Sequence, residues 1–200
     1  MGSSFKKDLE WANYVELAWM RFMESKTHRA YRQSNGLEPG WDIHDMTKGQ
    51  YYEVKWDSKS RAKWTMFKGS SEIKATGNLF IEYVNPSKEP PKPTGIMAST
   101  SDYWVYVVKE NLQELVDDFD VSKYRAKAHL FKREALLEFC KASELATKET
   151  KRDVAKGGSA NAKGWILPWA LVKENQKKSG WLNEFDISDY LSLPISIDYG

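Results

Sequence analysis

Two runs decide the fold of the first half of this chain: Trp41-Asp42-Ile43-His44-Asp45-Met46 and Gln50-Tyr51-Tyr52-Glu53-Val54-Lys55-Trp56. The second run is rich in the aromatic and β-branched residues that favour strands. Thr47-Lys48-Gly49 lies between the runs and is typical of a turn. We therefore expect an antiparallel hairpin over residues 41–56.

The alternation of the second strand places a carboxylate beside an ammonium group. Glu53 and Lys55 are two residues apart, so they project from the same face of the strand. Positions 42 and 54 are equidistant from position 48, so we expect Asp42 to lie across from the step between Glu53 and Lys55. Asp45 would replace Asp42 in a different register, and its side chain would point to the opposite face.

A helix is expected at the start of the chain, over about residues 5–24, because apolar side chains recur there at three- and four-residue steps. Glu16 falls on this apolar stripe, between Ala12 and Trp19. A carboxylate on the buried side of a helix is costly unless a partner compensates it. Two interpretations stay open: a boundary side chain that reaches solvent or a lysine, and a glutamate that faces an active site.

Two acidic groups that converge with a lysine form the set needed for metal-assisted hydrolysis of a phosphodiester. Carboxylate oxygens with a backbone carbonyl suit Mg²⁺, which keeps water at its other positions, and we expect Mn²⁺ to substitute. Such an ion polarises the phosphate and lowers the pKa of a bound water. The lysine can orient that water or stabilise charge in the transition state. Asp42, Glu53 and Lys55 are therefore candidate catalytic residues, and Glu16 is a fourth candidate under the interpretation in which it faces the active site.

Asp42 followed by Glu53-Val54-Lys55 on the next strand, after a helix that carries Glu16, resembles the PD-(D/E)XK nuclease superfamily. Trp41 stands where the family usually has a proline before the aspartate. The chain is also similar to small phage-encoded members in three later runs, which are Gly77–Tyr83, Thr100–Val107 and Gly157–Pro168.

The resemblance implies a four-stranded mixed sheet flanked by helices, a divalent metal at the aspartate and the glutamate, and DNA as the usual substrate. By position, Asp42 is the strand aspartate, Glu53 the variable acidic member and Lys55 the lysine. Glu16 is the helix glutamate of many members, and Val54 would lend its carbonyl oxygen to the metal.

The rest of the chain completes an expected α/β architecture of the α+β variant: a central four- to five-stranded mixed sheet flanked by helices, with a restriction-endonuclease-like core. We expect one domain over residues 1–200, with its core at about 5–108 and 150–170 and a helical insertion at about 110–148. The expected strands are 78–84, 102–108 and 165–168, the last one after a basic loop over 151–164, and the expected helices are 110–120, 132–147 and 169–178.

Three further polar residues are candidates for a supporting role around the site. Glu82 would extend the acidic site or hold Lys55, with a cross-strand ion pair as the alternative. His44 shares a strand face with Asp42, although a structural role is the simpler interpretation. Asp102 opens a strand, where it either caps the turn before that strand or contacts a phosphate.

The small net charge excludes a strongly basic protein that binds DNA over its whole surface. It leaves basic segments that could contact a polyanion. The chain has 30 basic and 28 acidic residues, yet residues 121–178 alone carry 14 basic and 6 acidic groups. Phosphate contacts give salt-dependent affinity without sequence information. The candidate DNA-binding residues lie after the second hairpin strand and in the late basic loop, and they are Lys59, Arg61, Lys63, Lys68, Lys151, Arg152, Lys156 and Lys163.

Composition narrows the setting of the protein. No apolar run approaches the roughly 20 residues that span a bilayer, the N-terminus lacks the apolar stretch of a signal peptide, and Cys140 is the single cysteine. We therefore expect no membrane partner and a reducing, cytoplasmic location.

The expected function is that of an Mg²⁺-dependent deoxyribonuclease of phage or mobile-element type, an endonuclease in the first instance. The alternatives are a structure-selective junction-resolving or homing-type nuclease, an inactive nucleic-acid-binding module of the same fold, and a protein-interaction domain. Double-strand cleavage by one such site usually requires two subunits, which is the reason to consider a homodimer.

Overall fold

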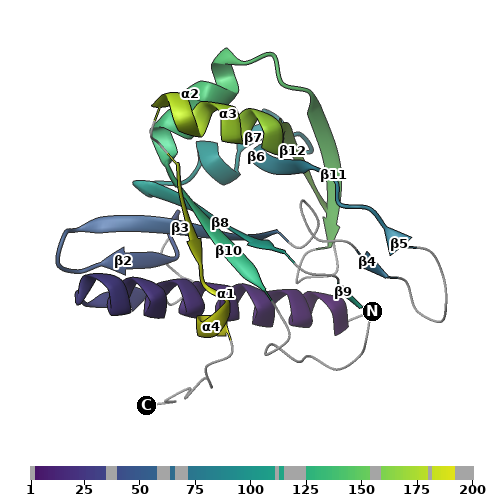
Figure 1. Ribbon diagram of the computed structural model, residues 1–200. Coiled ribbons are helices and arrows are strands. Elements are labelled where there is room, and N and C mark those ends of the chain that lie inside the picture. The colour runs from purple at the N-terminus through teal and green to yellow at the C-terminus, as the bar shows by residue number, and fades with distance from the viewer. Residues whose placement is uncertain are drawn as a thin grey trace.

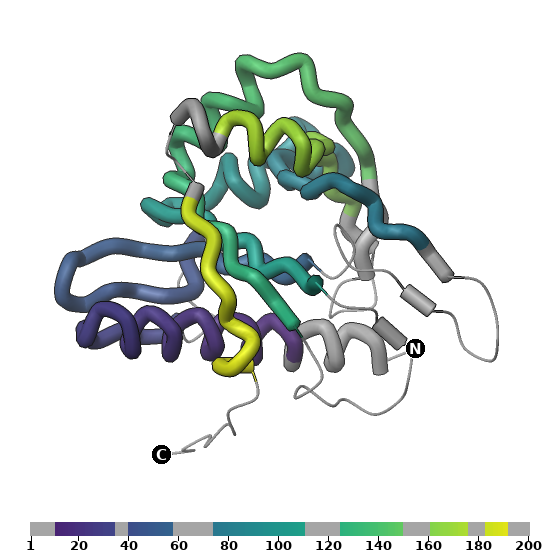
Figure 2. Tube along the Cα trace, viewed as in Figure 1, coloured from purple at the N-terminus to yellow at the C-terminus, as the bar shows by residue number. Residues whose placement is uncertain are grey.

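The computed structural model describes residues 3–34, 40–57, 64–65, 72–110, 113–114, 125–153, 159–179 and 182–191 (Figure 2). Of these, residues 3–10, 64–65, 72–73, 113–114, 150–153, 159–160, 176–179 and 182 are described by their backbone alone. The helices are α1 Ser3–Thr27, η1 Gly95–Met97 (a 3-10 turn), α2 Arg133–Ala142, α3 Trp169–Ser179 and α4 Ser188–Leu191. The strands are β1 Tyr31–Gln33, β2 Ile43–Asp45, β3 Gln50–Asp57, β4 Trp64–Thr65, β5 Glu72–Ile73, β6 Asn78–Asn85, β7 Lys92–Pro93, β8 Tyr103–Lys109, β9 Gln113–Glu114, β10 Ala126–Lys132, β11 Thr147–Asp153, β12 Ser159–Pro168 and β13 Leu182–Asp186.

A mixed sheet of six strands forms the middle layer, in the order β1-β2-β3-β8-β10-β13. Its neighbours are antiparallel except for β3 and β8, which run parallel. Strand β8 is central, as its apolar sequence predicts, and every residue from Trp104 to Lys109 is buried. The mixed α+β class is therefore confirmed, while the sheet is wider than the four to five strands expected.

Helix α1 covers one face of this sheet and lies along its underside (Figure 1). Its buried side chains recur every three or four residues, at Val15, Ala18, Trp19 and Phe22, which confirms the amphipathic helix expected there. They pack against the side chains of the sheet that face the helix, which include Ile43, Tyr52, Val54, Val105 and Val107. This packing fixes the direction in which each strand residue points.

A second sheet, in the order β11-β12-β6-β7, forms a third layer together with α2 and α3 on the opposite side of the six-stranded sheet (Figure 1). Leu79, Ile81 and Leu167 from this layer are fully buried and pack with Trp104 and Phe131 of the six-stranded sheet. The side chains of β3 that point away from α1 are therefore on the side of the second sheet.

Strand β10 and the β11–β12 hairpin depart from the sequence-based expectation. Residues 126–132 form a strand of the six-stranded sheet within the stretch expected to be a helical insertion, and α2 ends at Ala142 rather than near residue 147. The late basic stretch is paired as β11 and β12 rather than as a loop over 151–164, with residues 154–158 outside the described part. Strand β10 pairs with β8 and β13, and β12 pairs with the distant β6, and these pairings decide the two segments because strand preference depends mostly on packing against neighbours.

The acidic stretch at 110–120 also differs where it is described. Gln113 and Glu114 form β9, which pairs in parallel with β4, so the helix expected there is wrong at these two residues. Across the described residues, no helix combines the length and the apolar character needed to cross a membrane.

Candidate functional site

The candidate site lies where β2 diverges from β3. The two strands pair Ile43 with Tyr52 and Asp45 with Gln50, so continuing the register aligns position 42 with position 53 rather than 54. The expected register was wrong by one residue because the turn contains four residues, Met46–Gly49, instead of three. Gly49 donates its N–H to the Asp45 carbonyl at 2.8 Å and has a φ of 66°, which suits glycine.

Asp42 occupies the point where the ladder stops. Its backbone N–H donates to the Tyr52 carbonyl at 2.8 Å, and its carboxylate Oδ2 accepts the N–H of Val54 at 2.7 Å. The carboxylate therefore takes the place that a backbone carbonyl of β2 would have filled. N–H and C=O groups of one strand residue face the same neighbour. The Val54 carbonyl thus lies on the same open edge of β3 as the Asp42 carboxylate.

Glu53 and Lys55 project from the face of β3 that points away from α1, as the alternation predicts. The buried residues Tyr52 and Val54 belong to the core under α1, so the residues between and beyond them face the other way. The Lys55 ammonium donates a short hydrogen bond to Glu53 Oε1 and lies 5.5 Å above the ring of Trp104. The side chain of Glu53 is 12% exposed and that of Lys55 38% exposed, so the carboxylate is largely buried while part of the lysine side chain is open to solvent.

Glu16 reaches the same site from α1. Its Oε2 accepts a hydrogen bond from Nε2 of Gln33, at the end of β1, at 2.7 Å. Burial raises the pKa of Glu16 to about 7, and the nearby Asp42 carboxylate raises it further, while Gln33 and Lys55 act against this shift. Glu16 thus lies half-buried beside other charged groups rather than reaching solvent, and its place in an active site stays a prediction.

The four candidate catalytic residues influence one another electrostatically. Burial raises the pKa of Asp42 to about 6, with Glu53 adding to the shift, while Lys55 and the Val54 N–H oppose it. Burial acts to lower the pKa of Lys55, but Glu53 and Asp42 outweigh it, and the pKa is raised. Three carboxyl groups thus surround one ammonium group, so negative charge is in excess when all are ionised.

The oxygen donors of this set are of the kind that a hard divalent cation binds. Across the described residues, no three His, Cys, Asp or Glu side chains are grouped so that they could hold a metal by themselves. Mg²⁺ does not need such a cage, because it usually binds one or two carboxylates and keeps water or substrate phosphate as its other ligands. Asp42, Glu53 and the Val54 carbonyl would supply two carboxylates and one neutral oxygen, and the raised pKa of Asp42 shows that its negative charge lacks full compensation.

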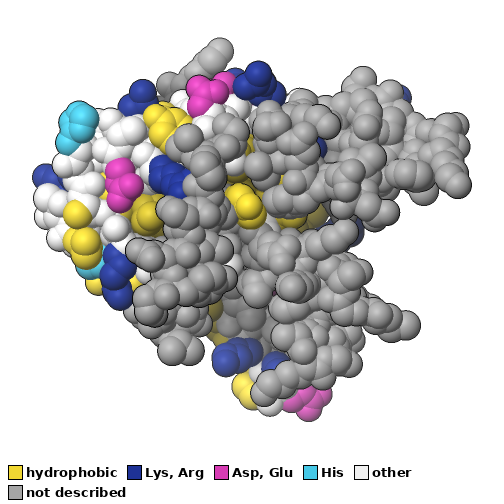
Figure 3. Space-filling model, turned by 90° about the horizontal axis from the view of Figure 1, so that it is seen from below, with side chains coloured by type: hydrophobic (Ala, Val, Ile, Leu, Met, Phe, Trp, Pro, Cys, Tyr) yellow, Lys and Arg dark blue, Asp and Glu magenta, His cyan; other side chains and the backbone are white. Residues whose placement is uncertain are grey.

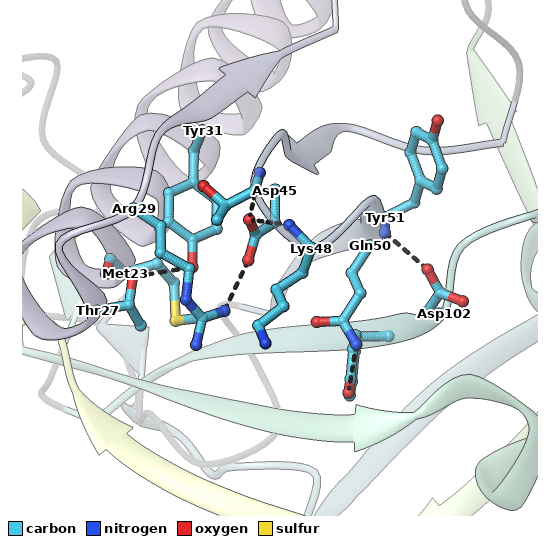
Figure 4. A network of polar contacts seen from close by, with 11 residues as sticks. Met23, Thr27, Arg29, Tyr31, Asp45, Lys48, Gln50, Tyr51 and Asp102 are labelled. Carbon is cyan, nitrogen blue, oxygen red and sulfur yellow. Dashed lines mark hydrogen bonds and ion pairs between the residues drawn. The ribbon is translucent and has the colours of Figure 1, made fainter.

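Asp45, the alternative strand carboxylate, belongs to the turn instead. It is fully buried on the α1 side, where Oδ2 accepts from Arg29 Nη1 at 2.8 Å and Oδ1 accepts the N–H groups of Thr47 and Lys48 at 3.0 Å each (Figure 4). Burial acts to raise the pKa of Asp45, but these hydrogen bonds outweigh it and lower the pKa. Its oxygens are fully engaged in structure, so Asp42 is the carboxylate at the candidate site.

The three supporting candidates lie in different places. His44 stacks on Tyr51, with ring centroids 4.4 Å apart and an interplanar angle of 9°, on the same hairpin as Asp42. Asp102 accepts the Tyr51 N–H at 2.8 Å through Oδ2 (Figure 4) and donates its own N–H to the Tyr51 carbonyl at 2.9 Å. It therefore joins the start of β8 to β3, which is the cap-like role rather than the phosphate contact.

Glu82 lies on β6 in the second sheet rather than on the sheet that carries Lys55. The two sheets meet nearby, because Tyr106, the register partner of Lys55, donates its hydroxyl to the Phe80 carbonyl at 2.8 Å. The backbone of Glu82 packs against Gly95, where an added Cβ would lie 2.3 Å from the Glu82 carbonyl oxygen. Glu82 thus forms part of the junction between β6 and η1, and its role toward Lys55 stays a prediction.

Most of the candidate DNA-binding side chains lie outside the described residues. These are Lys59, Arg61, Lys63, Lys68, Lys151, Arg152 and Lys156, although the backbones of Lys151 and Arg152 are described on β11. Lys163 is half-buried on β12, opposite Glu149 of β11. In the face seen in Figure 3, the Lys and Arg side chains that are described are scattered among hydrophobic and uncharged ones rather than gathered in one patch.

Comparisons with known protein families, with curated proteins and with solved structures find no match to this chain. The interpretation of the site therefore rests on its own geometry and electrostatics.

Gln33 and the segment around Gly40 are the parts of the site that sequence reasoning missed. Gln33 lies 17 positions from its partner Glu16, and the polar stretch that contains it carries no periodic signal. Gly40, with a φ of 89°, accepts hydrogen bonds from Thr100 N at 3.1 Å and Ser99 Oγ at 2.8 Å. An added Cβ would lie 2.8 Å from Thr100 N, so glycine lets the chain before Asp42 approach the start of β8. The run Asn35-Gly36-Leu37-Glu38-Pro39-Gly40, directly before Trp41, is a turn signal in the sequence and is the one feature that points to this position.

Proposed function

We propose that this protein is a divalent-metal-dependent deoxyribonuclease of the PD-(D/E)XK type, with the restriction-endonuclease-like core of that superfamily. One observation carries the proposal. Glu16 on α1, Asp42 before β2 and Lys55 on β3 lie close enough to Glu53 that its charge contributes to the pKa shift of each of the three. A surface ion pair between Glu53 and Lys55 alone would not bring two further carboxyl groups to the same place.

In this proposal each residue has a defined part. Asp42 and Glu53, with the Val54 carbonyl, would hold Mg²⁺ or Mn²⁺, which when bound supplies Lewis acidity toward the phosphate and its attacking water. Lys55, held by Glu53 and partly exposed, would present its positive charge to the phosphate or to that water. Gln33 keeps the Glu16 carboxyl directed toward Asp42 and Lys55.

The substrate follows from the same chemistry. A phosphodiester is an anion that the three carboxylates would repel and Lys55 would attract. A bound dication would offset the carboxylates and strengthen the attraction of the site for a phosphate. DNA is the substrate that the superfamily resemblance implies, and the basic segments beyond β3 and around β11–β12 would contact its backbone. If both strands of a duplex are cut at one position, a homodimer would supply the two sites.

The deciding experiment is cleavage of plasmid and branched DNA with Mg²⁺ or Mn²⁺, and with EDTA as the control. The proposal expects cleavage that is lost in EDTA, in Asp42→Asn and in Lys55→Ala, while these variants still bind DNA. Met46→Ala is the matched control, because Met46 is 53% exposed on the turn of the same hairpin, away from the site. Tight binding without cleavage of any DNA would favour the inactive binding module instead.

A further inference from the structure

An aromatic platform lies next to the candidate site, and it consists of Trp41, His44 and Tyr51 with Arg32. The sheet register aligns Arg32 with His44 and His44 with Tyr51, which places the three in one row across β1, β2 and β3. Their neighbours Tyr31, Ile43 and Tyr52 are buried under α1. The row therefore points to the other face of the sheet.

The rings of the platform contact one another. Trp41 lies 5.2 Å from Tyr51 and 5.9 Å from His44 between ring centroids, and the Arg32 guanidinium carbon lies 5.1 Å from the centroid of Trp41. Arg32 is exposed, and the three rings are half-buried. Part of the aromatic surface and of the Arg32 side chain is thus exposed to solvent.

The platform is continuous with the candidate catalytic residues. Tyr51, Glu53 and Lys55 occupy alternate positions of β3 and share one face, so each step along this row is about 7 Å. Trp41 directly precedes Asp42, and the bonds from Thr100 and Ser99 to the Gly40 carbonyl hold this segment against the start of β8. Tyr51 and Lys55 are two such steps apart, about 14 Å along the strand. A strand of DNA with a phosphate at Lys55 would therefore place a base near Tyr51 and Trp41 one or two nucleotides away.

We infer that the platform stacks an unpaired nucleobase one or two nucleotides from the cleaved phosphodiester, so that the substrate is DNA with single-stranded character beside the cut. Aromatic faces and arginine bind unpaired bases by stacking and cation–π contact, with little regard to sequence. A base inside a duplex is already stacked on its neighbours and must leave the helix before it can make such contacts. Single strands, flaps and frayed ends meet this requirement without that cost.

This inference rests on the proposed function, because a base reaches the platform when a phosphate of the same DNA strand lies at the candidate site. A purely structural role is the other explanation, since cross-strand aromatic pairs also stabilise a sheet. The two explanations predict different binding. If the aromatic contacts only stabilise the sheet, the protein should not bind an unpaired base differently from a paired one.

The test is binding in EDTA at low salt, which needs neither metal nor cleavage. A short single-stranded oligonucleotide carries 2-aminopurine at successive positions, and the fluorescence of this base falls when it stacks. We expect quenching at one or two adjacent positions with the unaltered protein, and none with the blunt duplex of the same sequence. Absence of quenching at every position of the single strand would overturn the inference without recourse to any variant.

Variants then locate the stacking. Trp41→Ala and Tyr51→Ala are expected to weaken binding of the single strand about tenfold, and to change binding of the duplex by less than about twofold. Tyr51→Phe keeps the ring and should retain affinity, as should Met46→Ala on the same hairpin. Equal losses for single strand and duplex, in variants whose circular dichroism is unchanged, would contradict the inference.

Cleavage of the same oligonucleotides with Mg²⁺ or Mn²⁺ separates the two proposals. Quenching without cleavage of any substrate would refute the nuclease proposal and leave base stacking in place. Cleavage of single strand and duplex at equal rates, without quenching, would refute the stacking inference and leave the nuclease proposal in place.

Discussion

Asp42 and Asp45 lie three residues apart on one hairpin and have opposite environments. Asp45, at the closed end, is fully buried, and its oxygens accept hydrogen bonds from Arg29 and two turn amides (Figure 4). Asp42, at the open end, accepts the Val54 N–H and has Glu53 and Glu16 nearby. The pKa of Asp45 is lowered and that of Asp42 is raised to about 6.

The difference separates a carboxylate that builds structure from one that is poised for a ligand. Compensation by donors stabilises an ionised group in the fold, whereas burial beside like charges leaves an electrostatic cost that a cation would relieve. The isosteric variants Asp42→Asn and Asp45→Asn remove the same charge from the two ends of the hairpin. They are therefore matched probes of this distinction.

The largest expected effect is on catalysis. We expect Asp42→Asn to reduce metal-dependent DNA cleavage by about 10³-fold, because it removes a proposed metal ligand. Asp45→Asn should retain most of the activity when it is assayed well below its melting temperature. Initial rates on plasmid DNA with Mg²⁺ measure both. Comparable losses of cleavage activity in the two variants would contradict the assignment of Asp42 to the site and of Asp45 to the turn.

Stability should respond in the reverse order. Asp45→Asn leaves Arg29 without its carboxylate and weakens the turn, at a cost of about 2–3 kcal/mol. For a chain of this length that corresponds to a fall in melting temperature of about 5–10 °C. Asp42→Asn keeps an oxygen that can accept the Val54 N–H and removes an unfavourable charge, so its melting temperature at neutral pH should equal or exceed that of the unaltered protein. Thermal unfolding followed by circular dichroism in EDTA tests both, and a large loss in Asp42→Asn would contradict the assignment.

Stabilisation of the protein by a divalent metal should depend on Asp42, at the open end of the hairpin, and not on Asp45. A ligand at about 100 times its Kd contributes about 2.7 kcal/mol to the folded state, or roughly 5–10 °C for a chain of this size. We expect Mn²⁺ to raise the melting temperature of the unaltered protein and of Asp45→Asn by comparable amounts, and to have little effect on Asp42→Asn. Mn²⁺ titration followed by EDTA, with thermal unfolding at each step, measures this. An equal rise in Asp42→Asn would place the cation elsewhere.

The pH dependence of folding stability tests Glu16, the other carboxyl group at the open end of the hairpin. Its pKa is raised from 4.5 to about 7, so the folded protein binds this proton more tightly than the unfolded chain. The resulting stability is present below about pH 4.5 and is lost as pH rises through about 7. In metal-free protein, Glu16→Gln should raise the melting temperature by a few degrees near pH 8 and change it little near pH 5. Melting curves across this range test the sign, and a lower melting temperature of the variant near pH 8 would contradict it.

Local sequence patterns were sufficient for the parts of the molecule in which neighbouring residues set the structure. The three- and four-residue spacing of Val15, Trp19 and Phe22 predicted α1, and the alternation of β3 predicted that Glu53 and Lys55 share a face. Strand β10 escaped prediction because β8 and β13 supply its pairing from opposite sides, and β12 likewise pairs with the distant β6 as well as with β11. Long-range pairing of this kind leaves little trace in a short window.

The site shows the same division between local and distant information. Asp42, Glu53, Lys55 and Glu16 could be proposed from residue type and spacing, but their convergence depends on a four-residue turn that sequence reasoning took to have three. The Asp45 side chain accepts the N–H groups of Thr47 and Lys48 and thereby favours the longer turn. A single residue in turn length decides which residue of β3 faces Asp42.

The smallest predicted effect concerns Gln33, which sequence reasoning missed. Its amide donates to Glu16 and acts to lower the pKa of that carboxyl. Gln33→Leu should therefore raise the pKa of Glu16 above about 7, and the loss of stability with rising pH should move to higher pH by less than about one unit. The variant should also be slightly less stable than the unaltered protein near pH 8, because the ionised carboxylate has lost its donor. In the Glu16→Gln background the same Gln33→Leu substitution should leave the pH profile unmoved, since no titrating group remains at position 16. A shift of the pH profile that persists in the Glu16→Gln background would contradict this assignment. It would show that Gln33, on β1, changes the pKa of a hairpin carboxylate such as Asp42 or Asp45 without acting through Glu16.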